Sequence, residues 1–300
     1  MLTRIICLCT IIFACSTAFA AANPNAKKTV LITGGMNGVG REIATAFKND
    51  GWNVWVTSRN PSQYPELTGV TVRKLDLTDQ AAVKQLMRDI QAKNGRLDVL
   101  VNNASYTLIG ATEATSVTQA REIMDVNVIA PFLLTQEALP LMRASHGGHI
   151  INISSTSGLR ALPGMGMYAA SKMALEGLSE ALAAETAQWN IKVSIIEPRG
   201  IKNEWIQNAS IAEKINDYPG YKTFTSNLQN KLAKKVEEIG QQPQEMGQFV
   251  LKVANTAKPN LRYQTDSSGA ALAHEILVDP SGNKMRDQTI AFSRELFELQ

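Results

Sequence analysis

Residues 29–40 have the sequence TVLITGGMNGVG, and this stretch decides the fold. Its first four residues are apolar or β-branched, which is typical of a buried strand. Glycines follow, and then a helical pattern from Val39 to Lys48. Glycine permits a tight turn and a close backbone approach to a phosphate, and the helix N-terminus offers free N–H groups. The stretch predicts a strand, a phosphate-binding turn and a helix.

Short β-rich runs alternate with longer helical stretches as far as residue 196. The expected strands are 29–32, 52–57, 70–72, 97–101, 149–153 and 191–196, and the expected helices are 39–48, 81–93, 117–143 and 167–189. Strands that are apolar throughout and alternate with helices form a parallel sheet covered on both faces. We therefore expect an α/β fold, a doubly wound parallel sheet in three α/β/α layers. Its ligand should lie beyond the carboxyl ends of the strands.

The glycines of the turn have the spacing Gly-x-x-x-Gly-x-Gly, and no Gly-Lys-Ser/Thr follows. The missing lysine disfavours a nucleoside-triphosphate P-loop. A turn with no ligand is the alternative to a dinucleotide site. On the dinucleotide interpretation, the turn contributes the cofactor-binding residues Gly34, Met36, Asn37, Gly38 and Val39.

The second expected strand is followed by the pair Ser58-Arg59. NAD-binding folds carry an acidic residue near this point for the ribose 2′-hydroxyl. A hydroxyl and a guanidinium suit a 2′-phosphate instead, through charge-assisted hydrogen bonds, and Arg41 adds to the positive charge. Solvated surface arginines are the alternative. We expect NADP as cofactor in preference to NAD.

Tyr168 and Lys172 are four residues apart in an expected helix and therefore share a face. An ammonium beside a phenol favours the phenolate and lowers the tyrosine pKa from its usual ~10. Such a tyrosine can exchange a proton near neutral pH. A purely structural role explains the isolated pair equally well. Tyr218 and Lys222 repeat the spacing but enclose Pro-Gly, which should keep them off a common helical face.

The order of these motifs resembles that of the short-chain dehydrogenases/reductases. The resemblance runs from about Thr29 to Ile201, and it includes the glycine turn, Asn102-Asn103-Ala104, Ile153-Ser154-Ser155 and Tyr168-x-x-x-Lys172. It implies a single Rossmann-type domain that uses NAD(P)(H) and no metal. The expected activity is interconversion of a carbonyl and a primary or secondary alcohol by hydride transfer.

The resemblance also implies roles for individual residues. Tyr168 would be the general acid/base, and Ser155 would hold and polarise the substrate oxygen. Lys172 would lower the tyrosine pKa and contact the nicotinamide ribose, and Asn127 would complete a proton relay through water. Further expected cofactor contacts are Tyr168, Lys172, Asp76, Leu77, Asn103, Pro198 and Ile201.

The sequence departs from the family pattern at two positions. Ser105 replaces the glycine of the usual Asn-Asn-Ala-Gly, and its side chain is expected to crowd the nicotinamide side of the pocket. Arg199 follows Pro198 where the family often has glycine, which affects the expected carboxamide contacts. Neither change touches the acid/base group.

Residues 27–300 are expected to form the catalytic domain, with 200–300 providing a substrate lid and C-terminal helices. Aromatic residues after Asn203 suit an apolar substrate, although helix packing explains them as well. The run 259–263 loosely resembles family members that act on steroids and retinoids. A last helix is expected over 288–299. We expect a small-molecule carbonyl or alcohol substrate and a homo-oligomer, either a dimer or a tetramer.

Residues 1–22 read as a signal peptide or a membrane anchor. Arg4 precedes an apolar run, and Ala18-Phe19-Ala20 is a small-x-small cleavage pattern. Cleavage would place the protein in a periplasm or lumen, whereas retention would tether it to a membrane with a cytosolic active site. All three cysteines lie in this leader, so the remaining chain has no thiolate metal site and no cysteine nucleophile.

The formal net charge is only +3, and no long Lys/Arg run occurs, which argues against nucleic acid as a partner. The histidines show no metal-ligand spacing. Three other classes of protein are less compatible with the sequence. A non-catalytic NAD(P)-binding sensor would not need Ser155, Tyr168 and Lys172 together. A sugar-nucleotide epimerase would favour Gly-x-x-Gly-x-x-Gly. An adhesion protein is suggested by the leader alone.

Overall fold

The computed structural model describes residues 27–277, 281–284 and 286–287. Its main sheet has seven parallel strands in the order β3-β2-β1-β4-β6-β7-β9. Their bounds are β1 Thr29–Ile32, β2 Asn53–Ser58, β3 Thr71–Lys74, β4 Val99–Asn102, β6 Gly148–Ile153, β7 Ile191–Glu197 and β9 Arg262–Gln264. The expected doubly wound α/β fold is confirmed.

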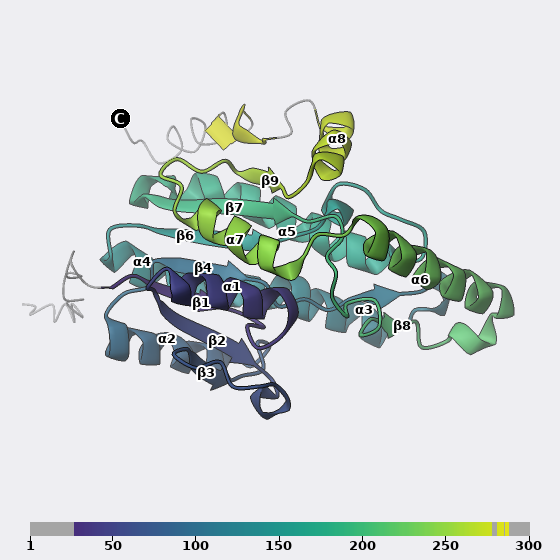
Figure 1. The fold of residues 1–300 in the computed structure, drawn as a ribbon, viewed down its shortest axis with the longest axis horizontal. Coiled ribbons are helices and arrows are strands. Elements are labelled where there is room, and N and C mark those ends of the chain that lie inside the picture. The colour runs from purple at the N-terminus through teal and green to yellow at the C-terminus, as the bar shows by residue number, and fades with distance from the viewer. Residues whose placement is uncertain (1–26, 278–280, 285, 288–300) are drawn as a thin grey trace, which may run out of the picture.

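Helices cover both faces of this sheet (Figure 1). The α-helices are α1 Gly38–Asn49, α2 Gln80–Asn94, α3 Val117–Met124, α4 Ala130–Ala144, α5 Gly166–Thr186, α6 Pro219–Ile239, α7 Pro243–Ala254 and α8 Ser267–Ile276. α1 and α7 pack together on one face, and α2, α4 and α5 pack on the other. A separate two-stranded parallel sheet joins β5 Leu108–Ile109 to β8 Ser210–Ile211.

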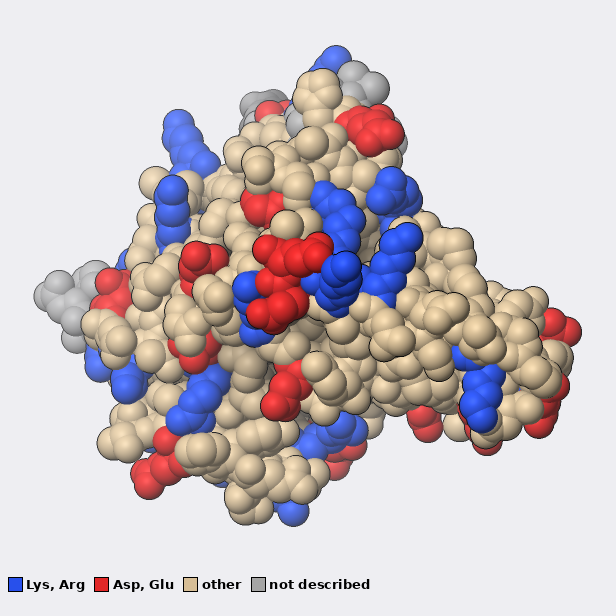
Figure 2. Space-filling model, turned by 45° about the vertical axis from the view of Figure 1, so that its right-hand side comes forward, with Lys and Arg blue, Asp and Glu red and all other residues tan. Residues whose placement is uncertain are grey.

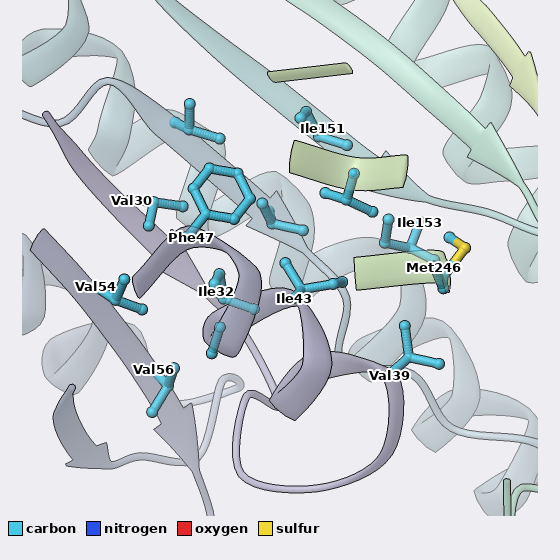
Figure 3. Close-up of a cluster of buried hydrophobic side chains, with 14 of the residues drawn as sticks. Val30, Ile32, Val39, Ile43, Phe47, Val54, Val56, Ile151, Ile153 and Met246 are labelled. Carbon is cyan, nitrogen blue, oxygen red and sulfur yellow. The ribbon is translucent and has the colours of Figure 1, made fainter. Parts of the chain in front are cut away.

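The core consists of two apolar layers, one on each side of the sheet. Figure 3 shows the layer beneath α1, where Phe47 and Ile43 meet Val30 and Ile32 of β1, and Met246 of α7 closes it. The opposite layer joins alternate residues of the same strands to α2, α4 and α5. Side chains alternate across a strand, so a strand covered on both faces buries side chains on both and is mostly apolar. This explains the burial of all four residues of β1.

Local signals set the helix ends. Asp79 precedes α2, and its side chain accepts a hydrogen bond from the backbone N–H of Ala82 at 3.0 Å. Gly95 ends that helix with a φ of 71°, a left-handed conformation that glycine adopts without strain. Ser116 and Gln119 form a capping box at the start of α3. The expected boundaries of α1, α2 and α5 are therefore close to those observed.

Three expectations about elements were wrong. The single helix expected over 117–143 is divided, because Asp125–Ile129 adopts a π-helical turn between α3 and α4. The seventh strand, β9, was not expected at all. Tyr218 and Lys222 do belong to one helical turn, because the N–H of Lys222 donates to the carbonyl of Tyr218 at 3.0 Å. Pro219 is the first residue of α6, where its missing N–H is tolerated.

The order of strands reverses between β1 and β4, and crevices at such points receive ligands in this fold class. The glycine turn leaves β1 there, and Asn102-Asn103 leaves β4 beside it. α6 extends beyond the carboxyl ends of the strands, away from the sheet (Figure 1). The leader 1–22 and the helix expected over 288–299 lie outside the described residues. Within the described part, no helix is long and apolar enough to cross a membrane.

Candidate active site

A cleft of about 1740 Å³ opens at the carboxyl ends of the strands. It is lined by residues from the glycine turn, the ends of β2, β3, β4, β6 and β7, the start of α5, and α6. The structure thus brings together nearly all of the expected site residues. Those that line it are Gly34, Met36, Asn37, Gly38, Val39, Ser58, Arg59, Asp76, Leu77, Asn103, Ser155, Tyr168, Lys172, Pro198 and Ile201.

Tyr168 and Lys172 lie on consecutive turns of α5. The Nζ of Lys172 is 5.7 Å from the centroid of the Tyr168 ring. Lys172 is 2% exposed, and its Nζ donates to the carbonyl of Ile153 at 2.9 Å. That carbonyl belongs to the last residue of β6, so the sheet holds the ammonium below the phenol.

Ser155 lies opposite the tyrosine, just past the end of β6. Its side chain lies beside that of Tyr168 and acts to lower the tyrosine pKa, and its Oγ accepts from the N–H of Ser157 at 3.1 Å. Two hydroxyls therefore meet at one point of the cleft. A carbonyl oxygen placed there could receive hydrogen bonds from both.

Burial dominates the protonation equilibria of this group. It raises the pKa of Tyr168 above its ordinary value of 10.0, and the Ser155 side chain only partly opposes the rise. The sequence led us to expect a lowered tyrosine pKa. Burial also lowers the pKa of Lys172 to about 8, although the nearby Glu176 carboxylate favours the ammonium. The difference arises because desolvation penalises the charged form of either group.

Asn127 is in the π-helical turn, and it does not line the cleft with the other site residues. Its Oδ1 accepts from the N–H of Tyr106 at 2.7 Å, and its Nδ2 donates to the Tyr106 carbonyl at 2.9 Å and to Ser171 Oγ at 3.0 Å. The amide therefore ties the loop after β4 to α5. These bonds brace the site, and the expected part of Asn127 in a proton relay through water stays a prediction.

Ser105 is accommodated beside this brace. Its Oγ lies 3.3 Å from Asn127 Oδ1, to which it donates a hydrogen bond. Ser105 lines the cleft, as does Arg199, the other departure from the family pattern. The Ser105 hydroxyl thus has a hydrogen-bond partner within the protein.

The glycine turn is shaped by close backbone contacts. Gly34 and Gly38 have φ values of 65° and 49°, which side chains rarely adopt. A Cβ at Gly40 would lie 2.2 Å from the Gly34 carbonyl oxygen and 2.6 Å from Asn103 Nδ2. Asn103 Nδ2 in turn donates to the carbonyl of Thr33 at 2.9 Å. Asn103 therefore supports the turn from below, which is a bracing contact as well as a lining position.

The far end of the cleft carries the 58–59 and 76–77 pairs. Asp76 Oδ1 accepts from the N–H and the hydroxyl of Thr78 at 3.0 and 2.8 Å, and these bonds, assisted by the charge of Arg59, lower the carboxyl pKa. Arg41 donates to the carbonyls of Pro65 and Glu66 at 2.8 and 3.1 Å. Arg41 therefore fastens the 65–66 loop to α1, and Arg59 is the arginine that faces Asp76.

Asn203 was missed by the sequence reasoning. Its Oδ1 accepts from the N–H of Trp205 at 3.2 Å, which leaves Nδ2 as the free end of the amide. A Cβ on Gly38 would lie 3.5 Å from that Nδ2, so the amide hydrogens reach the glycine turn from the opposite wall. The available signal was a hydrogen-bonding side chain shortly after Pro198, at the end of a parallel strand.

Side chains of both charge signs line the cleft, among them Arg59, Lys231, Asp76 and Glu204. Figure 2 shows Lys and Arg side chains beside Asp and Glu side chains on one face of the molecule, without a broad field of one sign. Among the described residues, no group of three His, Cys, Asp or Glu side chains could hold a metal ion. The electrostatics thus favour a compact ligand over an extended polyanion.

Sequence comparison identifies the family. The family model described as short chain dehydrogenase matches residues 28–214. The chain is a short-chain dehydrogenase/reductase. Retinol dehydrogenase 8 from Bos taurus is 32% identical over 276 residues, which cover 86% of this chain and 88% of that relative. Human 17-beta-hydroxysteroid dehydrogenase type 1 is 30% identical over 289 residues, covering 91% and 87%. Similarity to steroid and retinol dehydrogenases is thus confirmed.

Solved structures of short-chain dehydrogenases share the fold. A short-chain dehydrogenase from Streptomyces avermitilis aligns with a TM-score of 0.72 at 29% identity, covering 91% of this chain and 98% of that one. ElxO with NADP bound aligns with a TM-score of 0.65 at 29% identity, covering 82% and 99%. The chain is therefore an NAD(P)-dependent oxidoreductase of this family, with a single Rossmann-like domain.

The glycine turn fits the pyrophosphate of the family's nicotinamide cofactor. The N-terminus of α1 follows the turn, and Asn37 at its N-cap makes no side-chain capping bond, so the first N–H groups are free of a side-chain cap. The absence of a Cβ at Gly38 keeps the surface toward Asn203 open, and at Gly34 it permits close contact with Asn103 and Ala104. In this dehydrogenase Asn37, Gly38 and Val39 would hold the pyrophosphate, and Asn203 would approach it from across the cleft.

Proposed function

We propose that this protein interconverts a carbonyl and an alcohol with NADP(H), using Tyr168 as the general acid/base. The observation that carries the proposal is the group Ser155, Tyr168 and Lys172, with the Lys172 ammonium 5.7 Å from the centre of the Tyr168 ring, in one cleft with the glycine turn. General acid/base groups of this kind contribute roughly 10²–10⁴ in rate.

Each residue of the group has a separate role in the proposed reaction. When bound, the cofactor supplies or accepts a hydride at the substrate carbon. In reduction, Ser155 and Tyr168 donate hydrogen bonds to the carbonyl oxygen, and Tyr168 passes its proton to that oxygen as charge develops there. Lys172 stabilises the resulting phenolate. In oxidation the same groups act in reverse, so the tyrosine takes the alcohol proton.

NADP is the cofactor that we propose in preference to NAD. Ser58 and Arg59 end β2 where an NAD enzyme would carry a carboxylate for the 2′-hydroxyl. Arg59 can pair with a 2′-phosphate, while Asp76 nearby is held by Thr78. The NADP-bound relative ElxO is consistent with this assignment.

An apolar carbonyl or alcohol is the proposed substrate. The apolar residues that line the cleft include Leu162, Met165, Trp205, Phe224 and Leu228. These side chains offer a surface for a hydrocarbon skeleton and no fixed charge. The names of the relatives, retinol dehydrogenase 8 and 17-beta-hydroxysteroid dehydrogenase type 1, point to ligands of the same character.

The decisive experiment compares Tyr168→Phe with Tyr221→Phe. Tyr221 is exposed on α6 and is a matched control. NADPH oxidation is measured with a panel of apolar aldehydes and ketones, and NADPH binding is measured by fluorescence. Tyr168→Phe should lose turnover by about 10²-fold or more while keeping NADPH affinity. Equal turnover in Tyr168→Phe and the unmodified protein would refute the assignment, and so would NADPH binding without any turnover.

The cell location and assembly also remain proposals. A leader at 1–22 would direct the protein to a membrane or across one, which cell fractionation and mass analysis of the mature N-terminus can test. Ile129 and Phe132 near the start of α4 and Met173 of α5 are exposed apolar side chains. They support a homo-oligomer, for which light scattering of the purified protein is the test.

A further inference from the structure

A buried ionic cluster adjoins α5 on the C-terminal side of Lys172. Arg262, the first residue of β9, is 7% exposed and reaches three carboxylates. Its Nη1 donates to Glu197 Oε1 at 2.8 Å and contacts Glu176 Oε2, and its Nη2 contacts Glu180 Oε1. Glu176 and Glu197 are themselves buried. One guanidinium thus holds together α5, β7 and β9.

The cluster continues the line of site residues on α5. Tyr168, Lys172, Glu176 and Glu180 follow one another at intervals of four residues, so each lies next to the following one, about one turn along the helix. Glu176 is therefore one turn beyond Lys172. Among the described residues, no carboxylate lies within salt-bridge distance of Lys172, whose ammonium meets the neutral carbonyl of Ile153. Glu176 is the neighbouring carboxylate whose charge favours that ammonium.

The buried positive and negative side chains of this region are equal in number only if Lys172 is counted. The buried groups are Glu176 and Glu197 on one side and Arg262 and Lys172 on the other. Burial and the charge of Glu197 both raise the pKa of Glu176, and Arg262 opposes them. An unpaired buried charge is strongly unfavourable, so removing the guanidinium would drive Glu176 toward its neutral form. Arg262 thereby keeps a negative charge one turn from Lys172.

Close packing leaves little room for these side chains to move. A Cβ on Gly158 would lie 2.8 Å from both Glu176 Oε1 and Ser154 Oγ. On the other side, a Cβ on Gly282 would lie 3.1 Å from Arg262 Cδ. The N–H of Arg262 also donates to the carbonyl of Ser281 at 3.0 Å. Glu176 therefore presses on the loop that carries Ser155, and the chain after α8 covers the arginine.

We propose that Arg262 and Glu176 are positioning residues of the active site. Arg262 keeps Glu176 negatively charged one helical turn from Lys172, and this negative charge keeps Lys172 in its ammonium form beside Tyr168. The proposal rests on the function proposed above for Lys172. It assigns a role in the site to β9, a short strand that contributes no residue to the face of the cleft. A cluster that only stabilised the fold would leave the protonation of Lys172 unchanged.

The test measures the protonation of Lys172 directly. Protein carrying lysine labelled with ¹³C at Cε is titrated by NMR, and the Lys172 resonance is assigned by its loss in Lys172→Arg. The midpoint in the unmodified protein should lie near 8, the pKa that burial gives this lysine. Removing a nearby negative charge disfavours the ammonium, so Glu176→Gln should lower the midpoint by about one pH unit.

Two further variants sharpen the result. Arg262→Met should lower the midpoint in the same direction, because Glu176 then becomes neutral, and combining it with Glu176→Gln should add little more. Glu180→Gln is the matched control, since Glu180 also contacts Arg262 but is two turns from Lys172 and its side chain is 42% exposed. It should leave the midpoint in place.

The outcomes separate this inference from the proposed function. The titration needs no substrate, so it gives an answer even if Tyr168→Phe shows that the proposed reaction is wrong. In the active enzyme, the alkaline limb of the pH profile for kcat in reduction should move down with the midpoint, because reduction needs both Tyr168 and Lys172 protonated. A folded Glu176→Gln or Arg262→Met protein with an unchanged Lys172 midpoint would overturn the proposal.

Discussion

Arg59 should decide which cofactor binds. It is the arginine at the end of β2 that faces Asp76, whereas Arg41 is engaged with backbone carbonyls. A hydrogen bond to a charged group contributes about 1.5–3 kcal/mol, so Arg59→Ala should weaken NADPH binding roughly 10- to 100-fold. NADH, which lacks the 2′-phosphate, should bind as before. Fluorescence titration with both cofactors measures this, with Arg88→Ala on α2 as the control.

Asn203 should contribute equally to the binding of NADPH and NADH. Its Nδ2 faces the glycine turn, where it would meet the pyrophosphate that NADPH and NADH share. Loss of one neutral hydrogen bond corresponds to about 1 kcal/mol, so Asn203→Ala should raise both dissociation constants about fivefold. Asn208→Ala, which also lines the cleft, should change neither. A loss confined to NADPH would contradict the placement of this amide.

Sequence motifs predicted which residues lie in the site better than they predicted the hydrogen-bond partners of those residues. Ser155, Tyr168 and Lys172 were expected together and lie together, because the helical period and the strand end fix their places. Asn127 and Asn103 were expected to serve the reaction or the cofactor, roles that stay predictions, and the sequence did not indicate that their amides are bound to Tyr106 and Thr33. A side-chain amide can satisfy either the backbone or a ligand, and spacing alone does not choose between them.

At the scale of elements, α6 is the part of the fold that shapes the substrate side. Phe224, Leu228, Leu232 and Val236 recur every four residues and line the cleft from one side of this helix. The rest of the helix is mostly exposed to solvent. That it acts as the lid expected for residues after 200 stays a prediction. Its start at Pro219 was misjudged, since proline ends a helix in the interior but begins one at the first position.

Gly164 sets how closely α6 approaches the cleft. It has a φ of 77°, and a Cβ there would lie 2.7 Å from Leu228 Cδ2 and 2.8 Å from Phe224 Cε1. Gly164→Ala should therefore push the helix outward and raise KM for an apolar substrate several-fold, while NADPH affinity stays the same. Steady-state kinetics with an independent binding titration separates the two. Gly177→Ala on α5, where a Cβ meets nothing, is the control.

Short elements were the ones that sequence patterns failed to predict. β9 has three residues, too few for a periodic signal, and it follows a proline-containing run. It becomes a strand because β7 offers it an open edge. The π-helical turn at Asp125–Ile129 interrupts a continuous apolar pattern, so only the backbone geometry reveals it. Arg262 and Glu176 are 86 positions apart, and their pairing follows from the β7–β9 contact alone.

For the molecule as a whole, strand order places the chemistry. The parallel sheet gathers the ends of β1, β2, β3, β4, β6 and β7 at one edge, where the cleft lies. Right-handed crossovers predict this arrangement from the alternation of strands and helices. The opposite ends of the strands bear no part of the cleft. There, in the interior of the sheet, His149 of β6 is 4% exposed.

His149 should make the stability of the folded protein fall at acid pH. Its Nε2 lies 2.9 Å from Ser194 Oγ, and that hydroxyl donates to the carbonyl of Asn260 at 2.8 Å, so Nε2 carries the proton donated to Ser194. Burial, aided by the charge of Lys192, lowers the histidine pKa from 6.5 to about 3. The unfolded chain therefore takes up a proton that the folded one excludes. The stability due to neutral His149 is complete above pH 6.5 and is lost as the pH falls toward 3.

Urea unfolding at several pH values tests this in the unmodified protein, His149→Gln and His274→Gln. His149→Gln should be less stable at pH 7, because it disturbs a buried contact, yet its free energy of unfolding should fall less between pH 6.5 and 3. His274 is exposed on α8, so His274→Gln should follow the unmodified protein throughout. Parallel curves for the unmodified protein and His149→Gln across that range would show that the acid loss comes from other groups, such as buried carboxylates.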